Sequence, residues 1–123
     1  MALVLILDDR PDDRELIRLL VDDANHRSAD TGDAREAMTI LDREPVALVV
    51  VDLMMPAVDG WEFVERLRAH PRYGAIPTIV HSSMFGDDIA DIAAELGCRF
   101  VPKASDPSVL REAIGAALDG NAG

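Results

Sequence analysis

The spacing of apolar and polar residues along the chain predicts five strands, each followed by a helix. Helical segments carry apolar side chains three and four residues apart, which places them on one face of a helix. Strand segments are short runs of apolar residues. The predicted strands cover residues 3–7, 26–30, 46–51, 78–81 and 99–101. The predicted helices cover residues 10–23, 34–41, 60–69, 89–96 and 107–118.

Two of the strand segments indicate how the sheet is covered. Residues 3–7 and 46–51 are unbroken apolar runs, as expected for parallel strands with helices on both faces. Five strand–helix units in a chain of 123 residues therefore predict a doubly wound α/β fold, a three-layer sandwich around a parallel five-stranded sheet. We expect one domain over residues 1–123, with its core from about residue 3 to residue 118 and a frayed tail at residues 119–123.

The charge and composition of the chain exclude several classes of partner and an internal disulfide. Asp and Glu number 23 against 12 Lys and Arg, which gives a net charge of −11. Such a chain repels phosphate backbones, so nucleic acid is not expected as a direct partner. No apolar run approaches the ~20 residues of a membrane helix, and the single cysteine, Cys98, excludes an internal disulfide. We expect a protein of the reducing cytoplasm with no membrane partner.

Polar side chains follow four of the five predicted strands. Because the carboxyl ends of parallel strands meet at one edge of a sheet, we expect these side chains to gather there. Carboxylates that converge repel one another unless a cation lies between them, and Mg²⁺ with oxygen ligands suits such a site. A carboxylate beside Mg²⁺ can also act as a nucleophile toward phosphorus, with a hydroxyl and an ammonium group on the phosphoryl oxygens. The residues concerned are Asp8, Asp9, Asp52, Ser82, Ser83 and Lys103, the only lysine of the chain.

Four motifs, each at the end of a predicted strand, together resemble the receiver domain of two-component response regulators. The resemblance covers residues 3 to about 118 and implies a flavodoxin-like fold with the strand order 2-1-3-4-5. The segment that resembles the family's stretch around the phosphorylated aspartate is Asp52-Leu53-Met54-Met55-Pro56-Ala57-Val58-Asp59-Gly60. The other three motifs are Asp8-Asp9, Pro77-Thr78-Ile79-Val80-His81-Ser82 and Phe100-Val101-Pro102-Lys103.

The resemblance implies how a metal ion would be held. Asp52 would be the phosphoacceptor and would also ligate Mg²⁺, or Mn²⁺ in its place. The side chain of Asp9 and the backbone carbonyl of Met54 would complete the protein ligands. Asp8 would act mainly through a metal-bound water.

The resemblance also assigns the residues around the phosphoryl group. Ser82 and Lys103 would contact its oxygens, and Ser83 lies beside them. Phe100 would be the aromatic residue whose rotamer follows the movement of Ser82. From the residues alone, Phe100 fits a place in the core equally well.

The same resemblance implies partners. A sensor histidine kinase or a phosphotransfer protein would donate the phosphoryl group, and a downstream protein effector would read the surface of the fourth helix, fifth strand and fifth helix. The fourth helix carries acidic residues and no basic one, which argues mildly against dimers held by ion pairs. We expect a monomer or weak dimer that is a stand-alone regulator or a phosphorelay shuttle, and that turns over no external substrate.

Three other interpretations stay open at this point. A receiver-like domain could serve only for docking, without phosphorylation. A phosphatase of the haloacid-dehalogenase type also uses an aspartate after a strand, but it needs an acid two residues later, where Met54 stands. A flavodoxin-like FMN carrier shares the fold, but Asp8 and Asp9 would repel its phosphate.

Three further positions carry expectations. Ala104 follows Lys103 where the family usually has a proline, often after a cis bond. His81 lies in an apolar strand, which favours a core histidine over a metal ligand. Asp59 is expected to serve the Asp59–Gly60 turn.

Overall fold

The structure of the protein is a computed structural model that describes residues 1–55, 58–84 and 86–122. For Val58, Asp59 and residues 120–122 only the backbone is described. Pro56 and Ala57 of the motif around Asp52 lie outside the described residues, and so does the side chain of Asp59 in its predicted turn.

Five parallel strands form one sheet in the order β2-β1-β3-β6-β7. These strands are β1 (Leu3–Leu7), β2 (Arg27–Thr31), β3 (Val46–Val51), β6 (Thr78–Ser82) and β7 (Arg99–Pro102). Numbered along the chain without the two short strands, the order is 2-1-3-4-5, so the predicted fold class is confirmed. The short strands β4 (Met54–Met55) and β5 (Val58–Asp59) pair with each other antiparallel, outside the main sheet. The sequence did not predict this pair.

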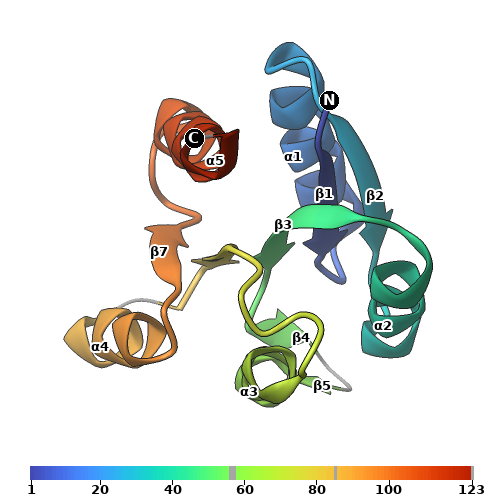
Figure 1. Ribbon diagram of the computed structural model, residues 1–123. Coiled ribbons are helices and arrows are strands. Elements are labelled where there is room, and N and C mark those ends of the chain that lie inside the picture. The colour runs from blue at the N-terminus through green and yellow to red at the C-terminus, as the bar shows by residue number, and fades with distance from the viewer. Residues whose placement is uncertain (56–57, 85, 123) are drawn as a thin grey trace.

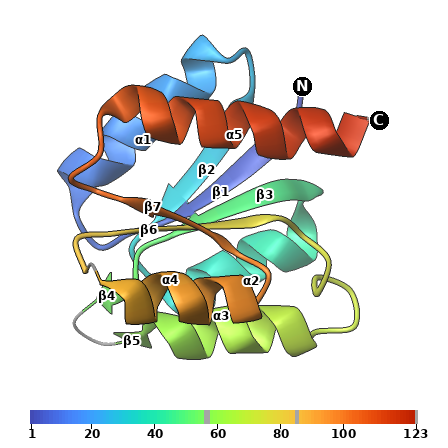
Figure 2. The same ribbon diagram turned by 90° about the vertical axis from the view of Figure 1, so that its left-hand side faces the viewer.

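Five helices cover the two faces of the sheet. They are α1 (Pro11–Asp23), α2 (Ala34–Arg43), α3 (Gly60–Ala69), α4 (Asp87–Glu95) and α5 (Pro107–Ala122). Helices α1 and α5 lie on one face, and α2, α3 and α4 lie on the other (Figure 1 and Figure 2). Among the described residues, none of these helices combines the length and apolar character that crossing a bilayer requires.

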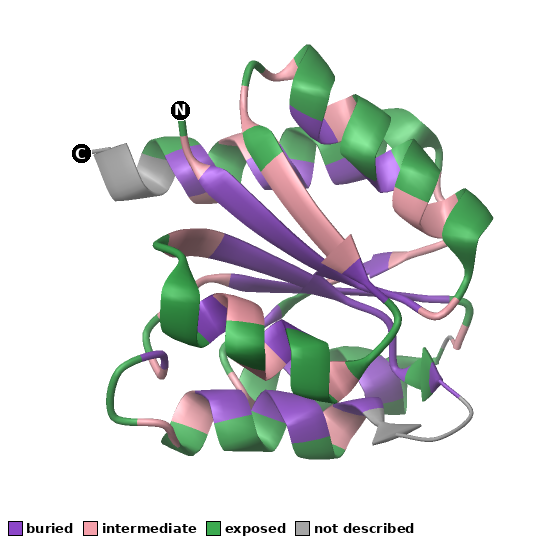
Figure 3. Ribbon diagram, turned by 90° about the vertical axis from the view of Figure 1, so that its right-hand side faces the viewer, coloured by how far each residue is buried: buried purple, intermediate pink, exposed green. Residues whose placement is uncertain are grey.

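The sheet separates two apolar clusters, one under each helical layer. Leu5, Val49 and Val51 face the cluster under α2, α3 and α4, whereas Ile6 and Val50 face the cluster under α1 and α5. Figure 3 shows the central strands of the sheet buried, the edge strand β2 largely intermediate, and the outer sides of the helices exposed. Strands β1 and β3 are apolar at every position because both of their faces are covered.

The last helix differs from the prediction. Helix α5 begins as expected at Pro107, where the Asp106 carboxylate accepts a hydrogen bond from the backbone N–H of Ser108. It then continues through Ala122, four residues beyond the helix end predicted at residue 118, and fraying of the tail stays a prediction. The segment contains no proline, so nothing in it removes a backbone donor from the helix.

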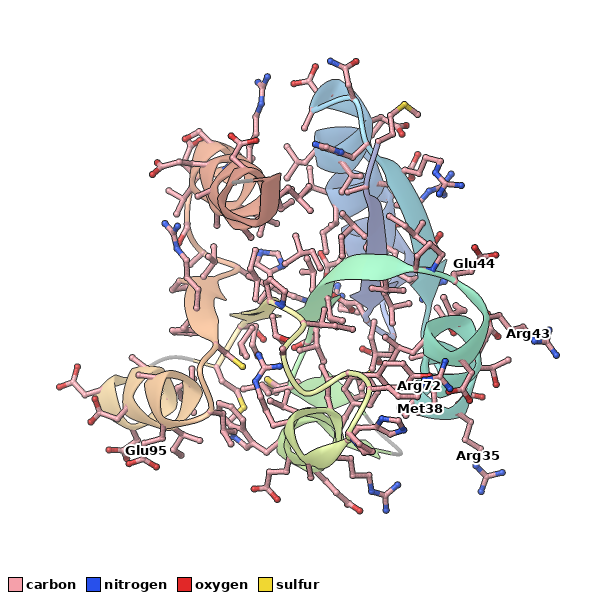
Figure 4. The ribbon with its side chains drawn as sticks, in the orientation of Figure 1. Arg35, Met38, Arg43, Glu44, Arg72 and Glu95 are labelled. Atoms are coloured by element: carbon pink, nitrogen blue, oxygen red, sulfur yellow. The ribbon has the colours of Figure 1, made fainter. Side chains whose placement is uncertain are left out.

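Arg68 joins the end of helix α3 to the segment around the end of helix α4. Its guanidinium donates to the backbone carbonyls of Leu96 (2.7 Å) and Ile76 (2.8 Å). By contrast, Arg35, Arg43 and Glu95 point away from the body of the molecule (Figure 4). Arg68 is therefore a structural link rather than a solvated charge.

Candidate functional site

Two neighbouring parallel strands bring the predicted carboxylates together. Leu7 at the end of β1 is in register with Val51 at the end of β3, and the backbone N–H of Asp52 donates to the carbonyl of Leu7 (2.9 Å). Asp8 and Asp9 follow the first of these strands. One carboxylate oxygen from each of Asp8, Asp9 and Asp52 lies within 4.8 Å of the others. The structure thus places the three predicted acids in one cluster.

Lys103 brings a positive charge to this cluster. Its backbone N–H donates to the carbonyl of Ser82 (2.8 Å), which holds the loop after β7 beside the end of β6. Its Nζ lies 2.9 Å from an oxygen of Asp8 and 2.9 Å from an oxygen of Asp52. The shortest contact, 2.6 Å, is with an oxygen of Asp13. The ammonium therefore has three carboxylates as neighbours.

Asp13 is a site residue that the sequence analysis missed. It lies on the first turn of α1 and reaches Lys103 across 90 positions of the chain. The signal in the sequence was weak, since Asp13 is one of two acidic residues on the first turn of the helix that follows Asp8 and Asp9. The predicted site included only residues that follow strands, and Asp13 lies on a helix.

The single ammonium group of Lys103 neither neutralises the charge of the surrounding carboxylates nor provides a hydrogen bond for every carboxylate oxygen. Burial raises the pKa of Asp8, and its contact with Lys103 only partly opposes this shift. The pKa of Lys103 is lowered by burial, but its contacts with Asp13, Asp8 and Asp52 outweigh that effect and raise it above its ordinary value. One buried carboxylate oxygen of Asp9 has no hydrogen-bond partner, and one of Asp8 has only the ion pair with Lys103.

The arrangement of donors fits a hard divalent cation. Three clustered carboxylates, two of which have a buried oxygen atom without a hydrogen-bond partner, offer the ligands that Mg²⁺ prefers. Together they carry more negative charge than one lysine balances. Met54 adds a backbone contact, since its N–H donates to the carboxylate of Asp52 (3.0 Å). This hydrogen bond fixes the orientation of the Asp52 side chain.

The carboxylates open onto a pocket of about 630 Å³. Its lining includes most of the predicted residues, and also Arg10 and Asp13. Ser83 is exposed on its wall and donates a hydrogen bond to the sulfur of Met54 (3.3 Å). The described residues that line the pocket are Asp9, Arg10, Asp13, Asp52, Leu53, Met54, Met55, Ser83 and Lys103.

Three predicted residues lie away from the pocket wall. Asp8 is buried behind the cluster. Ser82 is fully buried, and its hydroxyl accepts a hydrogen bond from the backbone N–H of Met84 (3.2 Å). Phe100 is half-buried and packs against the apolar cluster under α2, α3 and α4. The hydroxyl of Ser82 is thus engaged with the β6–α4 loop in this structure.

Gly60 permits the close approach of helix α3 to this site. A Cβ atom at this position would lie 2.4 Å from the Cα of Leu53, the residue after Asp52. Any other residue at Gly60 would push on the backbone next to the candidate phosphoacceptor.

Two other expectations concern the ends of β6 and β7. His81 is buried, and burial lowers its pKa to about 4, so it is neutral at pH 7. It is not a member of the carboxylate cluster. The described residues contain no cis peptide bond, so the Lys103–Ala104 bond is trans.

Comparison with known proteins identifies the family. The model of the response regulator receiver domain family matches residues 4–115, so the chain belongs to this family. This confirms the resemblance seen in the sequence. Receiver domains are phosphoacceptor signalling modules of two-component systems, and the chain is one of them.

Two relatives match most of this chain. Response regulator Rre1 of Synechocystis is 36% identical over 115 residues, which cover 90% of this chain and 48% of Rre1. An uncharacterised 14.6 kDa protein of Leptolyngbya boryana is 31% identical over 105 residues, covering 85% of this chain and 80% of that protein. The chain spans less than half the length of Rre1.

Solved structures share the fold. A response regulator receiver protein from Pseudomonas putida has a TM-score of 0.84 and 28% identity, with 93% of this chain and 95% of that chain covered. The chemotaxis response regulator CheY4 of Vibrio cholerae has a TM-score of 0.85 at 24% identity, with 96% and 99% covered, and supports the fold.

Proposed function

We propose that this domain is a switch in which Asp52 accepts a phosphoryl group with Mg²⁺ bound. The observation that carries the proposal is the cluster of Asp8, Asp9 and Asp52 within 4.8 Å, next to the ammonium of Lys103 and open to a pocket. A buried nucleophile, an oxygen-rich metal site and a fixed cation are the groups that phosphoryl transfer to a carboxylate needs.

The metal would be held by Asp9, Asp52 and the carbonyl of Met54, with Asp8 acting through a water. When bound, Mg²⁺ neutralises phosphoryl oxygens and reduces the repulsion among the carboxylates. Asp52 is oriented by the N–H of Met54 at 3.0 Å, and its other oxygen faces Lys103 at 2.9 Å. These contacts hold the nucleophile while leaving the pocket open to a donor.

The transfer step breaks one bond and forms one. A carboxylate oxygen of Asp52 forms a bond to phosphorus while the phosphorus–nitrogen bond of a phosphohistidine breaks, and the imidazole nitrogen takes up a proton. The product is an acyl phosphate on Asp52. Lys103 stabilises charge on the phosphoryl oxygens, since its Nζ already lies beside Asp52.

The acyl phosphate changes the contacts of Ser82. Its hydroxyl now accepts from the N–H of Met84, and we propose that it turns to donate to the phosphoryl group instead. That exchange would shift the β6–α4 loop and with it the surface of α4, β7 and α5, with Phe100 following. Ser83, already on the pocket wall, would contribute a second hydroxyl.

The partners follow from this chemistry. A sensor histidine kinase or a phosphotransfer protein would donate the phosphoryl group, and a protein effector would bind the altered surface. The residues of α4 that face solvent include Asp87, Asp88, Asp91 and Glu95. An effector that binds there would present basic groups. We place this exchange in the cytoplasm, with the domain acting as a monomer or weak dimer.

Intact mass measurement tests the phosphoacceptor. The purified protein is incubated with Mg²⁺ and a small phosphodonor, alongside Asp52→Asn and a control, Asp87→Asn, which removes an exposed acid of α4. We expect the parent protein and the control to gain about 80 Da, the mass of one phosphoryl group, and Asp52→Asn to gain nothing. Chelating Mg²⁺ should abolish the gain.

Other results would point elsewhere. Equal labelling of Asp52→Asn would show that the assignment is wrong. Absence of both labelling and Mg²⁺ binding in the parent protein would favour a docking module. Steady hydrolysis of a chromogenic phosphate ester would favour a phosphatase.

A further inference from the structure

Asp13 holds the ammonium of Lys103 more closely than the two buried acids do. The Nζ–Oδ2 distance is 2.6 Å for Asp13, against 2.9 Å for Asp8 and for Asp52. Asp13 enters the site from helix α1, whereas the other two acids follow strands. Its side chain is 27% exposed, so it lies at the rim of the pocket rather than behind it.

Asp13 is separate from the acids that could hold a metal. The three carboxylates with oxygens within 4.8 Å of one another are those of Asp8, Asp9 and Asp52. The ion pairs of Asp13 are with Lys103 and, at 3.4 Å, with Arg10, whose side chain is 71% exposed. Asp13 therefore acts on the lysine and not on the metal cluster.

The three carboxylates already occupy Lys103. A lysine ammonium has three N–H donors, and its Nζ has three carboxylate neighbours within 2.9 Å. To donate to a phosphoryl oxygen, Lys103 must give up one of them. A cation bound to the cluster would draw on Asp8 and Asp52, and Asp13 would remain as the competitor for the ammonium.

The negative charge of Asp13 determines the direction of its effect on the phosphoryl group. Asp13 lines the same pocket as Asp52, so a phosphoryl group on Asp52, with a charge of about −2 at pH 7, would face another carboxylate. The carboxylate both repels the phosphoryl group and withholds its lysine. Asparagine at this position would keep the shape of the side chain but remove its charge.

We infer that Asp13 is a positioning residue that restrains Lys103 and thereby shortens the lifetime of the phosphoryl group on Asp52. This inference rests on the proposed phosphorylation of Asp52. It assigns to a residue of helix α1 the task of setting how long the signal persists.

Two variants on the same turn of α1 test the inference. Asp13→Asn removes the contact with Lys103. Asp12→Asn removes the same charge from an exposed neighbour whose side chain makes no hydrogen bond or ion pair in the described part of the chain. After labelling with Mg²⁺ and a small phosphodonor, the donor is removed and the loss of the phosphoryl mass is followed over time. We expect the lifetime in Asp13→Asn to rise about three- to tenfold, as expected for removing one partly screened charge, and Asp12→Asn to match the parent protein.

A second readout does not depend on phosphorylation. Lys103 is the only lysine, so its reductive methylation is located unambiguously by mass, with the α-amino group as an internal reference. Freeing the ammonium from Asp13 should speed methylation of Lys103 in Asp13→Asn by at least about threefold, with no change in Asp12→Asn.

The outcomes separate the two proposals. Equal methylation of Lys103 in both variants would overturn the restraint by Asp13, and so would faster methylation without a longer phosphoryl lifetime. If no variant takes up phosphoryl groups while methylation still responds to Asp13→Asn, the proposed function fails, and with it the effect on signal lifetime, although the contact is real.

Discussion

Replacing Lys103 by methionine removes the ammonium that lies among Asp8, Asp13 and Asp52. The lysine side chain is 13% exposed, and those of Asp8 and Asp52 are 2% exposed, so these two ion pairs are buried. At an effective dielectric constant near 20, unit charges ~4 Å apart attract by about 4 kcal/mol, but desolvation offsets much of this. Removing one partner of a buried pair costs about 3–5 kcal/mol. We expect the free energy of unfolding of Lys103→Met to fall by that amount without Mg²⁺.

The metal should reverse part of this loss. Without the ammonium, the carboxylate cluster is more negative and should bind Mg²⁺ more tightly, and binding to the folded state alone adds to stability. Urea denaturation of the parent protein and Lys103→Met, each with and without saturating Mg²⁺, measures both effects. Arg66→Met is the control, because Arg66 makes an exposed pair with Glu62 worth at most about 0.5 kcal/mol.

Two results would refute this reasoning. One is a Lys103→Met variant as stable as the parent protein without Mg²⁺. The other is a Mg²⁺ response that is larger in the parent protein than in Lys103→Met. Either would mean that Lys103 does not balance the charge of the carboxylates.

Two further predictions concern residues beside the site. The pKa of His81 is about 4 in the folded protein against 6.5 for the free side chain, so its contribution to stability is complete above pH 6.5 and is lost as the pH falls. Between pH 6.5 and pH 5 the parent protein should lose about 2 kcal/mol more than His81→Leu does in urea denaturation, and equal losses would contradict this. Gly60→Ala should destabilise by at least about 2 kcal/mol, because its Cβ meets the backbone of Leu53. Gly115→Ala, with open space around its Cβ, should instead stabilise the helix by about 0.5–1 kcal/mol, and thermal unfolding that ranks the two variants the other way would show that the contact is not tight.

The sheet and the edge that carries the carboxylate cluster could be predicted because apolar runs and strand ends are local features of the sequence. Strands β1 and β3 are apolar throughout, and the acids directly follow them. The β4–β5 pair could not be predicted, since strands of two residues have no alternation to read. The sequence also could not tell which of two adjacent serines faces the pocket, because that depends on the direction of the side chain at the end of β6. The structure has Ser83 on the wall and Ser82 buried.

Asp13 could not be predicted as a site residue for a different reason. Its contact with Lys103 joins a helix near the start of the chain to a loop near its end. Such a contact depends on how α1 packs against the sheet. The pattern of residues in either segment does not determine this packing. The sequence hinted at it only by placing an acidic residue on the first turn of the helix that follows Asp8 and Asp9.

The anchoring of helix α4 by Arg68 makes the two ends of that helix unequal. At its far end, the carbonyl of Leu96 is bound by the Arg68 guanidinium at 2.7 Å. At its near end, Gly86 has a φ of 129° and provides no side-chain cap. A rigid helix that is held at one end rotates about that end when its other end is displaced. If Ser82 moves as proposed, helix α4 would rotate about its end at Leu96. The displacement of the α4 surface would then be largest around Asp87.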